Sequence, residues 1–186
     1  MGALQLLDRD VAESGTIELH RRRTDPGALV DMAIEPHRAA SEQAQVTIRA
    51  EVFPGLPEVF VDPDRMQLVF SNLLTNAIRF APRDSEIVVR ARAEASRAEA
   101  GSHRAPAPTH IRFEVADRGP GISKDHQTGL FEKFFRVPGS PEGGSGLGLF
   151  IAKGVVQAHG GEIGIASQPG EGAMFWFTVP VVAPAA

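Results

Sequence analysis

A helix that carries amide and guanidinium side chains on one patch is the first candidate for chemistry. The segment from Pro63 to Phe80 has an apolar face of Met66, Val69, Phe70, Leu73, Leu74, Ala77 and Ile78. At about 100° per residue, Asn72, Asn76 and Arg79 share the edge of the opposite face. An asparagine oxygen can ligate a hard cation such as Mg²⁺, and an arginine on the next turn can contact the phosphates that this cation bridges. An ordinary polar helix face explains the same pattern, so other motifs must decide.

A glycine-rich stretch, residues 143–161, leads directly into an amphipathic helix. Glycines allow a ligand to approach backbone N–H groups closely, and a helix N-terminus attracts anions. The helix is predicted to run from after Gly146 to His159, with Gly160 in the left-handed cap position. The pattern predicts a phosphate site, although glycine turns before helices also occur for packing reasons.

A single carboxylate, Asp117, ends an apolar strand and precedes Gly119 and Gly121. It can accept a hydrogen bond from an exocyclic amine such as adenine N6, while the glycines let a base approach the backbone. An aspartate that only starts a turn is the other interpretation.

Two cations follow aromatic residues in the segment Phe131–Arg136. We expect the aromatic side chains to lie in the core, whereas Lys133 or Arg136 could swing onto a terminal phosphate. Solvated charges beside a packed aromatic cluster would give the same sequence. The segment 137–145 is rich in Gly, Pro and Ser and is predicted to be a flexible lid.

Helices and strands must position these residues. Helices are predicted over 1–13, 26–45, 63–80, 127–131 and 147–159, with Asp25 and Asp62 as N-caps and a kink at Pro36. Strands are predicted over 16–19, 46–52, 58–61, 87–92, 111–115, 162–166 and 173–179, the last two antiparallel. The Ala, Arg, Glu and Pro-rich segment 94–109 is predicted to be a mobile loop.

Composition bounds the class of protein. A chain of 186 residues with 42% hydrophobic residues suits one main domain with a small appendage. A net charge of −4 argues against a general nucleic-acid binder, and the absence of cysteine excludes disulfides and thiolate metal sites. No apolar run approaches the roughly 18 to 20 residues that span a bilayer, so we expect no direct membrane contact by this segment. The absence of cysteine fits a reducing compartment, and we expect a cytoplasmic location, whether or not the parent protein is anchored in a membrane.

Taken in order, the motifs resemble the ATP-binding catalytic domain of sensor histidine kinases. This domain has the Bergerat fold, which DNA gyrase B, MutL and the large heat-shock chaperones share. The segment Asn72–Phe80 is similar to the N box of that family, Asp117–Ile122 to G1, Phe131–Arg136 to the F box and Gly144–Leu149 to G2. The segment Gly170–Phe175 is similar to the final glycine hairpin, and the resemblance covers roughly residues 16–180.

The resemblance implies a two-layer α/β sandwich, with a mixed and mainly antiparallel sheet packed against about three helices, and ATP and Mg²⁺ as ligands. Asn76 would hold Mg²⁺, Arg79 would contact phosphates, Asp117 would read adenine, and Lys133 or Arg136 would approach the γ-phosphate. The other implied nucleotide contacts are Phe80, Gly119, Gly121, Ile122, Gly144, Gly146, Leu147, Gly148 and Leu149.

One position separates subclasses of the family. In gyrase-like relatives, the residue four before the Mg²⁺-binding asparagine is a glutamate that activates water, and here it is Asn72. Because an amide cannot take a proton from water, the resemblance favours phosphate transfer over hydrolysis, with Asn72 among the catalytic residues together with Asn76, Arg79 and Arg136.

The family transfers phosphate to a histidine on a dimeric helical hairpin, where an acidic residue follows the histidine. None of the six histidines here is followed by Asp or Glu. Residues 1–15 resemble instead the end of such a hairpin, and residues 16–183 the kinase domain. The chain therefore looks like part of a longer, homodimeric histidine kinase that relays phosphate to a response-regulator receiver domain, and we expect it not to autophosphorylate alone.

Two alternatives stay open. A serine kinase of the anti-sigma-factor type has the same fold, although the hairpin-like N-terminus argues against it. A nucleotide-gated interaction module without catalysis is the other alternative, and binding of ATP without transfer to any supplied hairpin would favour it.

Overall fold

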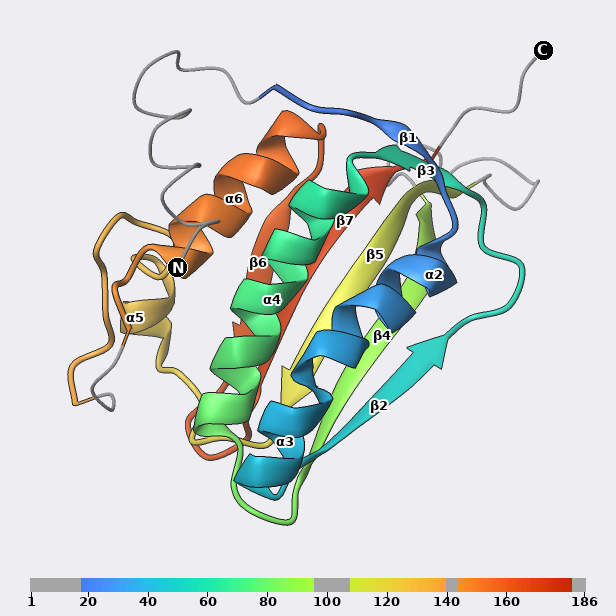
Figure 1. Cartoon of the computed structure of the whole chain (residues 1–186). Helices are drawn as coiled ribbons and strands as arrows, with labels where there is room; N and C mark the ends of the chain where they lie inside the picture. Colours follow the sequence, from blue (N-terminus) through green and yellow to red (C-terminus); the bar gives the residue numbers. More distant parts are fainter. Residues whose placement is uncertain (1–17, 96–107, 140–143, 182–186) are drawn as a thin grey trace, which may run out of the picture.

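Helices cover one face of a five-stranded sheet in the computed structural model, which describes residues 18–95, 108–139 and 144–181 (Figure 1). The described elements are β1 (Arg22–Thr24), α2 (Pro26–Ile34), η1 (Glu35–His37), α3 (Arg38–Ala44), β2 (Thr47–Val52), β3 (Val59–Val61), α4 (Pro63–Phe80), β4 (Glu86–Ala95), β5 (Pro108–Asp117), α5 (Lys124–Gln127), α6 (Gly148–Ala158), β6 (Ile163–Ser167) and β7 (Ala173–Pro180).

The sheet has the strand order β2-β4-β5-β7-β6, and β1 and β3 form a separate antiparallel pair. Within the sheet, β2 and β4 are parallel, and the other neighbouring strands are antiparallel. The predicted two-layer sandwich with a mixed, mainly antiparallel sheet is confirmed.

The core lies between α4 and the sheet. Helix α4 runs between α6 on one side and α2 on the other (Figure 1). Its predicted apolar face is buried, apart from the half-buried Ile78. The ring of Phe70 meets Phe113 of β5 and Phe177 of β7 edge to face, at centroid distances of 5.3 and 5.1 Å. This packing fixes the rotation of α4 and therefore which residues its polar edge presents.

Local sequence signals set the helix ends as predicted. The side chain of Asp62 caps α4 by accepting N–H groups of Asp64 and Arg65, and Pro63 begins the helix. Asp25 caps α2 in the same way. Pro36 interrupts the second predicted helix, where one turn becomes the 3₁₀ segment η1.

Three predictions need correction. The described residues of the proposed strand 16–19 are not extended in a sheet, and the strand forms instead at β1, where Arg22–Thr24 pairs with β3. The helix predicted at 127–131 lies earlier in the chain, as α5 at Lys124–Gln127, and residues 128–134 form a run of turns in which Gly129 lies against the ring of Phe135. The predicted loop 94–109 is shorter, since β4 extends to Ala95 and β5 begins at Pro108; residues 96–107 and the predicted helix 1–13 lie outside the described residues.

The face of the sheet opposite the helices carries a network of charges. Glu114 is 3% exposed and accepts hydrogen bonds from the guanidinium groups of Arg90, Arg92 and Arg112, at 3.0, 3.1 and 2.8 Å. Burial alone would raise the pKa of Glu114, but these three arginines outweigh it and hold the pKa below its ordinary value. Arg112 also lies 4.1 Å over the ring of Trp176. Three arginine side chains thus pair with the buried carboxylate of Glu114 on this face.

A buried histidine joins the start of α4 to the end of α6. His159 is 2% exposed; its Nδ1 lies 2.8 Å from the carbonyl of Val155, and its Nε2 accepts the backbone N–H of Asp62 at 3.0 Å. The ring is therefore neutral, with its proton on Nδ1. The carboxylate of Asp62 also accepts the N–H of His20, and Arg21 donates to the carbonyl of Ala158 at 2.5 Å. His20 and Arg21, which precede β1, therefore make hydrogen bonds to the start of α4 and the end of α6.

This arrangement predicts acid sensitivity. Burial lowers the pKa of His159 below its ordinary 6.5, so the unfolded chain binds the proton at a higher pH than the folded chain. The contribution of His159 to the free energy of unfolding is then present above about pH 6.5 and is lost below it, at up to about 1.4 kcal/mol per pH unit. Urea unfolding between pH 5 and 8 measures this slope. The variant His159→Gln should show a shallower slope over this range, and an unchanged slope would contradict the assignment.

Candidate nucleotide site

The polar edge of α4 faces the glycine-rich stretch before α6. The Oδ1 of Asn72 lies 2.7 Å from the position that a Cβ on Gly148 would occupy, and Nη1 of Arg79 lies 2.8 Å from the same position on Gly144. Asn76 is half-buried on the helix between these two residues. This edge of α4 therefore lies against the glycine-rich stretch. The Nδ2 of Asn72 is buried and has no hydrogen-bond partner among the described residues.

Among the residues that the structure describes, no side chain caps the N-terminus of α6. Leu147 is at the N-cap position, and its side chain caps none of the first N–H groups. Gly146 has a φ of +71°, which a residue with a side chain rarely adopts. Helix α6 begins at Gly148, close to the predicted start, and Gly160 has the predicted left-handed conformation, with a φ of +77°. Residues 140–143 of the predicted lid lie outside the described residues.

Asp117 lies at the end of β5 with its carboxylate held by backbone groups. The N–H of Gly119 donates to its Oδ1 at 2.7 Å, and the N–H of Ala173 also donates to it. Burial raises the pKa of Asp117, and the two N–H groups oppose this shift only in part. A Cβ on Gly119 would lie 2.9 Å from the carbonyl oxygen of Phe80, the last residue of α4. Half-buried Ile122 ends this loop and donates its N–H to the hydroxyl of Ser167 at 2.9 Å.

The predicted core position of the aromatic residues in 131–136 is correct for two of the three. Phe131 meets Phe175 edge to face at 6.5 Å, and Phe135 packs over Gly129. Phe134 is 64% exposed, so its prediction is wrong.

The backbone explains the exception. Phe134 has a φ of +65°, and its N–H donates to the carbonyl of Gly146 at 3.0 Å. This left-handed turn directs the side chain outward while its backbone holds the glycine stretch. Lys133 and Arg136 are exposed, and the Nζ of Lys133 lies 5.2 Å from the ring centroid of Phe134.

Four glycine contacts bring the predicted motifs together. A Cβ on Gly119, Gly144, Gly146 or Gly148 would come within 3.0 Å of Phe80, Arg79, Phe134 or Asn72, respectively. Each of these close approaches joins residues of two different motifs. Segments that are far apart in the sequence therefore form one continuous surface of α4, residues 117–122, residues 131–136 and the N-terminus of α6.

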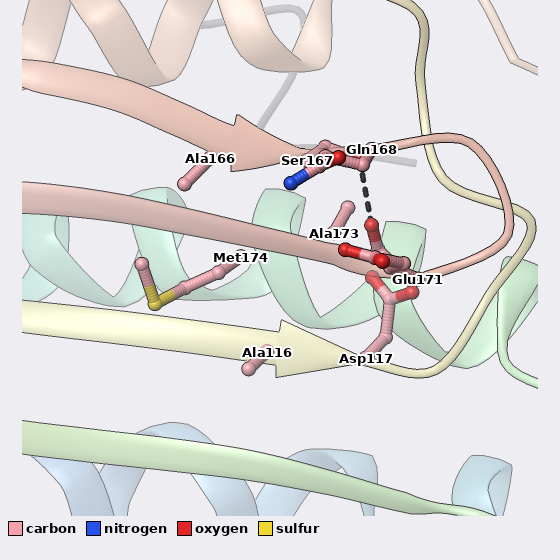
Figure 2. A pocket seen from close by; sticks show the side chains of 9 residues that line it. Ala116, Asp117, Ala166, Ser167, Gln168, Glu171, Ala173 and Met174 are labelled. Atoms are coloured by element: carbon pink, nitrogen blue, oxygen red, sulfur yellow. Dashed lines mark hydrogen bonds between the residues drawn. The ribbon is translucent and has the colours of Figure 1, made fainter.

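A hollow of about 280 Å³ lies next to this surface at the ends of β5, β6 and β7 (Figure 2). Ala116, Ala166 and Met174 form its apolar part and point away from the helices, which lie behind the strands in Figure 2. Asp117 and Glu171 line it as well. The hollow has two carboxylates and none of the predicted phosphate contacts, so it does not suit a polyphosphate.

Sequence reasoning missed two residues beside Asp117. Gln127 and Ser167 make side-chain hydrogen bonds to the backbone of the loop 117–122, of the end of β6 and of the turn 168–172. No periodicity or spacing signals them, because their partners are backbone groups as many as 45 residues away. Only the folded structure identifies them.

The fold is an α/β sandwich, and the predicted motifs lie together at one end of its helices. Residues 61–183 match the family described as "Histidine kinase-, DNA gyrase B-, and HSP90-like ATPase". The chain belongs to this family, so the resemblance noted from its motifs is confirmed.

Curated relatives are sensor kinases. The chain is 34% identical to the sensor-like histidine kinase SenX3 of Mycolicibacterium smegmatis over 84% of its own length and 38% of the relative. It is 32% identical to the adaptive-response sensory kinase SasA of Synechocystis over 88% of its length and 40% of the relative. For the alginate biosynthesis sensor protein KinB of Pseudomonas aeruginosa the identity is 32%, over 97% of this chain and 29% of the relative. The chain thus spans 40% or less of the length of these relatives.

Solved structures agree with the fold. Full-length ShkA in complex with AMPPNP superposes with a TM-score of 0.77 at 28% identity, over 98% of this chain and 36% of that one. The catalytic domain of histidine kinase ThkA superposes with a TM-score of 0.71 at 22% identity, over 89% of this chain and 97% of that one, and supports the fold alone. Within the described residues, no helix is both long and apolar enough to cross a membrane.

Proposed function

We propose that this domain binds Mg·ATP on the surface formed by α4, residues 117–122 and the N-terminus of α6, and donates the γ-phosphate to a histidine of the longer protein. The observation that supports this most is the convergence of the four glycine contacts, which joins the motifs into one surface. The family and its AMPPNP-bound structural relative support ATP as the ligand.

Asp117 would read the base. Its half-buried carboxylate accepts two backbone N–H groups and can accept a further donor, because a carboxylate has about four lone-pair sites. The exocyclic amine of adenine is such a donor. Gly119, Gly121, Ile122 and Phe80 would surround the base at this end of the surface, where glycines allow close approach.

The polyphosphate would lie at the N-terminus of α6. The uncapped N–H groups at this helix start, together with those of Gly144, Gly146 and Leu149, suit a polyanion. The N–H of Leu147 donates to the hydroxyl of Ser145 at 3.3 Å and would exchange that partner for a phosphate oxygen. Arg79 next to Gly144 adds positive charge, and the unpartnered Nδ2 of Asn72 is a further donor. Lys133 and Arg136, both exposed beside the glycine stretch, would approach the γ-phosphate.

Asn76 would hold Mg²⁺ through its side-chain oxygen. Its half-buried position on α4, between Asn72 and Arg79, fits a cation that keeps most of its ligands from phosphate and water. When bound, Mg²⁺ supplies charge neutralisation on the phosphates. Asn72 cannot take a proton from water, which favours transfer to another nucleophile over hydrolysis.

The remaining roles concern the longer protein. We infer that the phosphoacceptor histidine lies on a dimeric hairpin that ends near residue 15, and that phosphate then passes to a receiver domain in the cytoplasm. Sensor kinase relatives that are longer than this chain support this relay.

Removing the amide of Asn76 should abolish the contribution of Mg²⁺ to binding. For Asn76→Ala we expect the affinity for an ATP analogue in the presence of Mg²⁺ to fall at least about tenfold, to its value without Mg²⁺. Calorimetric titration with and without Mg²⁺ measures this. Thr75→Ala, at the exposed neighbouring position on α4, is the matched control and should retain the Mg²⁺ effect. An Mg²⁺ effect that persists in Asn76→Ala would remove this residue from the metal site.

Transfer itself distinguishes the alternatives. If the hairpin of the parent protein is supplied in trans with labelled ATP, the proposal expects acid-labile phosphohistidine on the hairpin. Acid-stable phosphoserine on a partner would favour the serine kinase. Tight binding of ATP without any transfer would favour the interaction module.

A further inference from the structure

Two side chains outside every predicted motif, those of Gln127 and Ser167, make hydrogen bonds to the loop 117–122. Gln127, at the end of α5, donates from its Nε2 to the carbonyl of Ile122 at 2.7 Å and to the carbonyl of Ser167 at 2.9 Å. Both protons of its amide are therefore used, one on the loop and one on the end of β6. The side chain is half-buried, so water cannot easily replace it as the hydrogen-bond donor to these two carbonyl groups.

The hydroxyl of Ser167 makes the second connection. It accepts the N–H of Ile122 at 2.9 Å and donates to the carbonyl of Gly172 at 2.6 Å. Ser167 thus links the end of the loop 117–122 to the turn that joins β6 and β7.

These bonds lead to the carboxylate of Asp117. Gly172 immediately precedes Ala173, whose N–H donates to Asp117. The turn also donates the N–H of Gly170 to the carbonyl of Pro120 at 2.7 Å. The position of the turn relative to the loop therefore sets where the carboxylate points and how far it lies from a bound base.

We propose that Gln127 and Ser167 are positioning residues for the base-binding end of the nucleotide site, which set the affinity for adenine without contacting it. This inference rests on the proposed function, since it needs a nucleotide at Asp117. None of their bonds reaches α4, Arg79 or the N-terminus of α6, so the phosphate end of the surface should be independent of them.

The chemistry of the two side chains suggests the variants. Gln127→Met keeps the length of the side chain and removes both donors, leaving two carbonyls without their partner. Ser167→Ala removes both bonds of the hydroxyl, whereas Ser167→Thr keeps the hydroxyl. Thr128→Val, at the exposed next residue after α5, is the matched control for Gln127.

The test compares two ligands, ATP and inorganic triphosphate, each with Mg²⁺, by competition against a fluorescent ATP analogue. We expect Gln127→Met and Ser167→Ala to bind ATP about tenfold more weakly and triphosphate as the unchanged chain does, with Ser167→Thr close to the unchanged chain. A general loss of folded protein would weaken both ligands equally and would leave their ratio unchanged. Thermal unfolding of each variant shows whether the protein is still folded. If Gln127→Met does not fold, the affinities of Ser167→Ala for the two ligands test the inference.

The outcomes separate the two claims. If the unchanged chain fails to bind ATP, both the proposed function and this inference are wrong. If the unchanged chain binds ATP but the variants keep the same ratio of ATP to triphosphate affinity, only the positioning role is contradicted.

Discussion

Replacing Asp117 by asparagine should weaken binding of an ATP analogue about 100-fold, with little change in the fold. The carboxylate already accepts the N–H groups of Gly119 and Ala173. In asparagine, an NH₂ group replaces one of the two carboxylate oxygens. This donor must face either a backbone N–H or the amine of the base, and neither can accept its hydrogen bond. A hydrogen bond to a charged group is worth about 1.5–3 kcal/mol, which corresponds to this loss. Calorimetric titration of both chains measures it.

Glu171→Gln is the matched control for this variant. Glu171 is a second carboxylate that lines the same hollow, but it is exposed in the turn after β6. Its neutralisation should leave the affinity within about twofold, since surface charges contribute little. Equal effects of the two variants would mean that the negative charge of this region matters and that Asp117 has no specific role.

Adding one methyl group at Gly121 should cost about 3 kcal/mol of folding free energy and most of the nucleotide affinity. Gly121 has a φ of +71°, and its Cβ would lie 1.9 Å from the carbonyl oxygen of Gln168. The left-handed conformation costs an L-residue about 1–2 kcal/mol, and an overpacked contact with backbone adds about 1–3 kcal/mol. The loop 117–122 must move away from the turn 168–172 to relieve the contact. Urea unfolding of Gly121→Ala together with titration measures both losses.

Gly170→Ala separates the two causes. Gly170 has a similar φ of +83°, but nothing lies within 4 Å of the position of its Cβ. This variant should therefore lose only the conformational share, about 1 kcal/mol, and keep its affinity. If Gly170→Ala were as damaging as Gly121→Ala, the close approach to Gln168 would not be the cause.

Features that depend only on neighbouring residues in the chain could be predicted from the sequence. The helix 63–80 could be predicted from the cap at Asp62, the proline after it and the spacing of its apolar residues, and the structure has the same bounds. The orientation of Asn72 and Arg79 follows from the same periodicity, because burial of one helix face fixes the other.

Contacts between distant segments could not be predicted in this way. The strand β1 forms because residues 22–24 meet β3, almost forty residues later, and the local alternation at 16–19 does not reveal that pairing. The exposure of Phe134 depends on a backbone bond to Gly146, and the roles of Gln127 and Ser167 depend on carbonyls that the fold brings to them. The motifs predicted which residues belong to the site, but the structure was needed to find what holds them in place.

The most direct test of the proposed function is calorimetric titration of the unchanged chain with a non-hydrolysable ATP analogue, with and without Mg²⁺. The proposed site predicts saturable binding of one analogue per chain in the micromolar range, about −8 kcal/mol, tighter with Mg²⁺ than without it. The absence of saturable binding in both titrations would contradict the nucleotide site and leave the joined glycine motifs without a ligand.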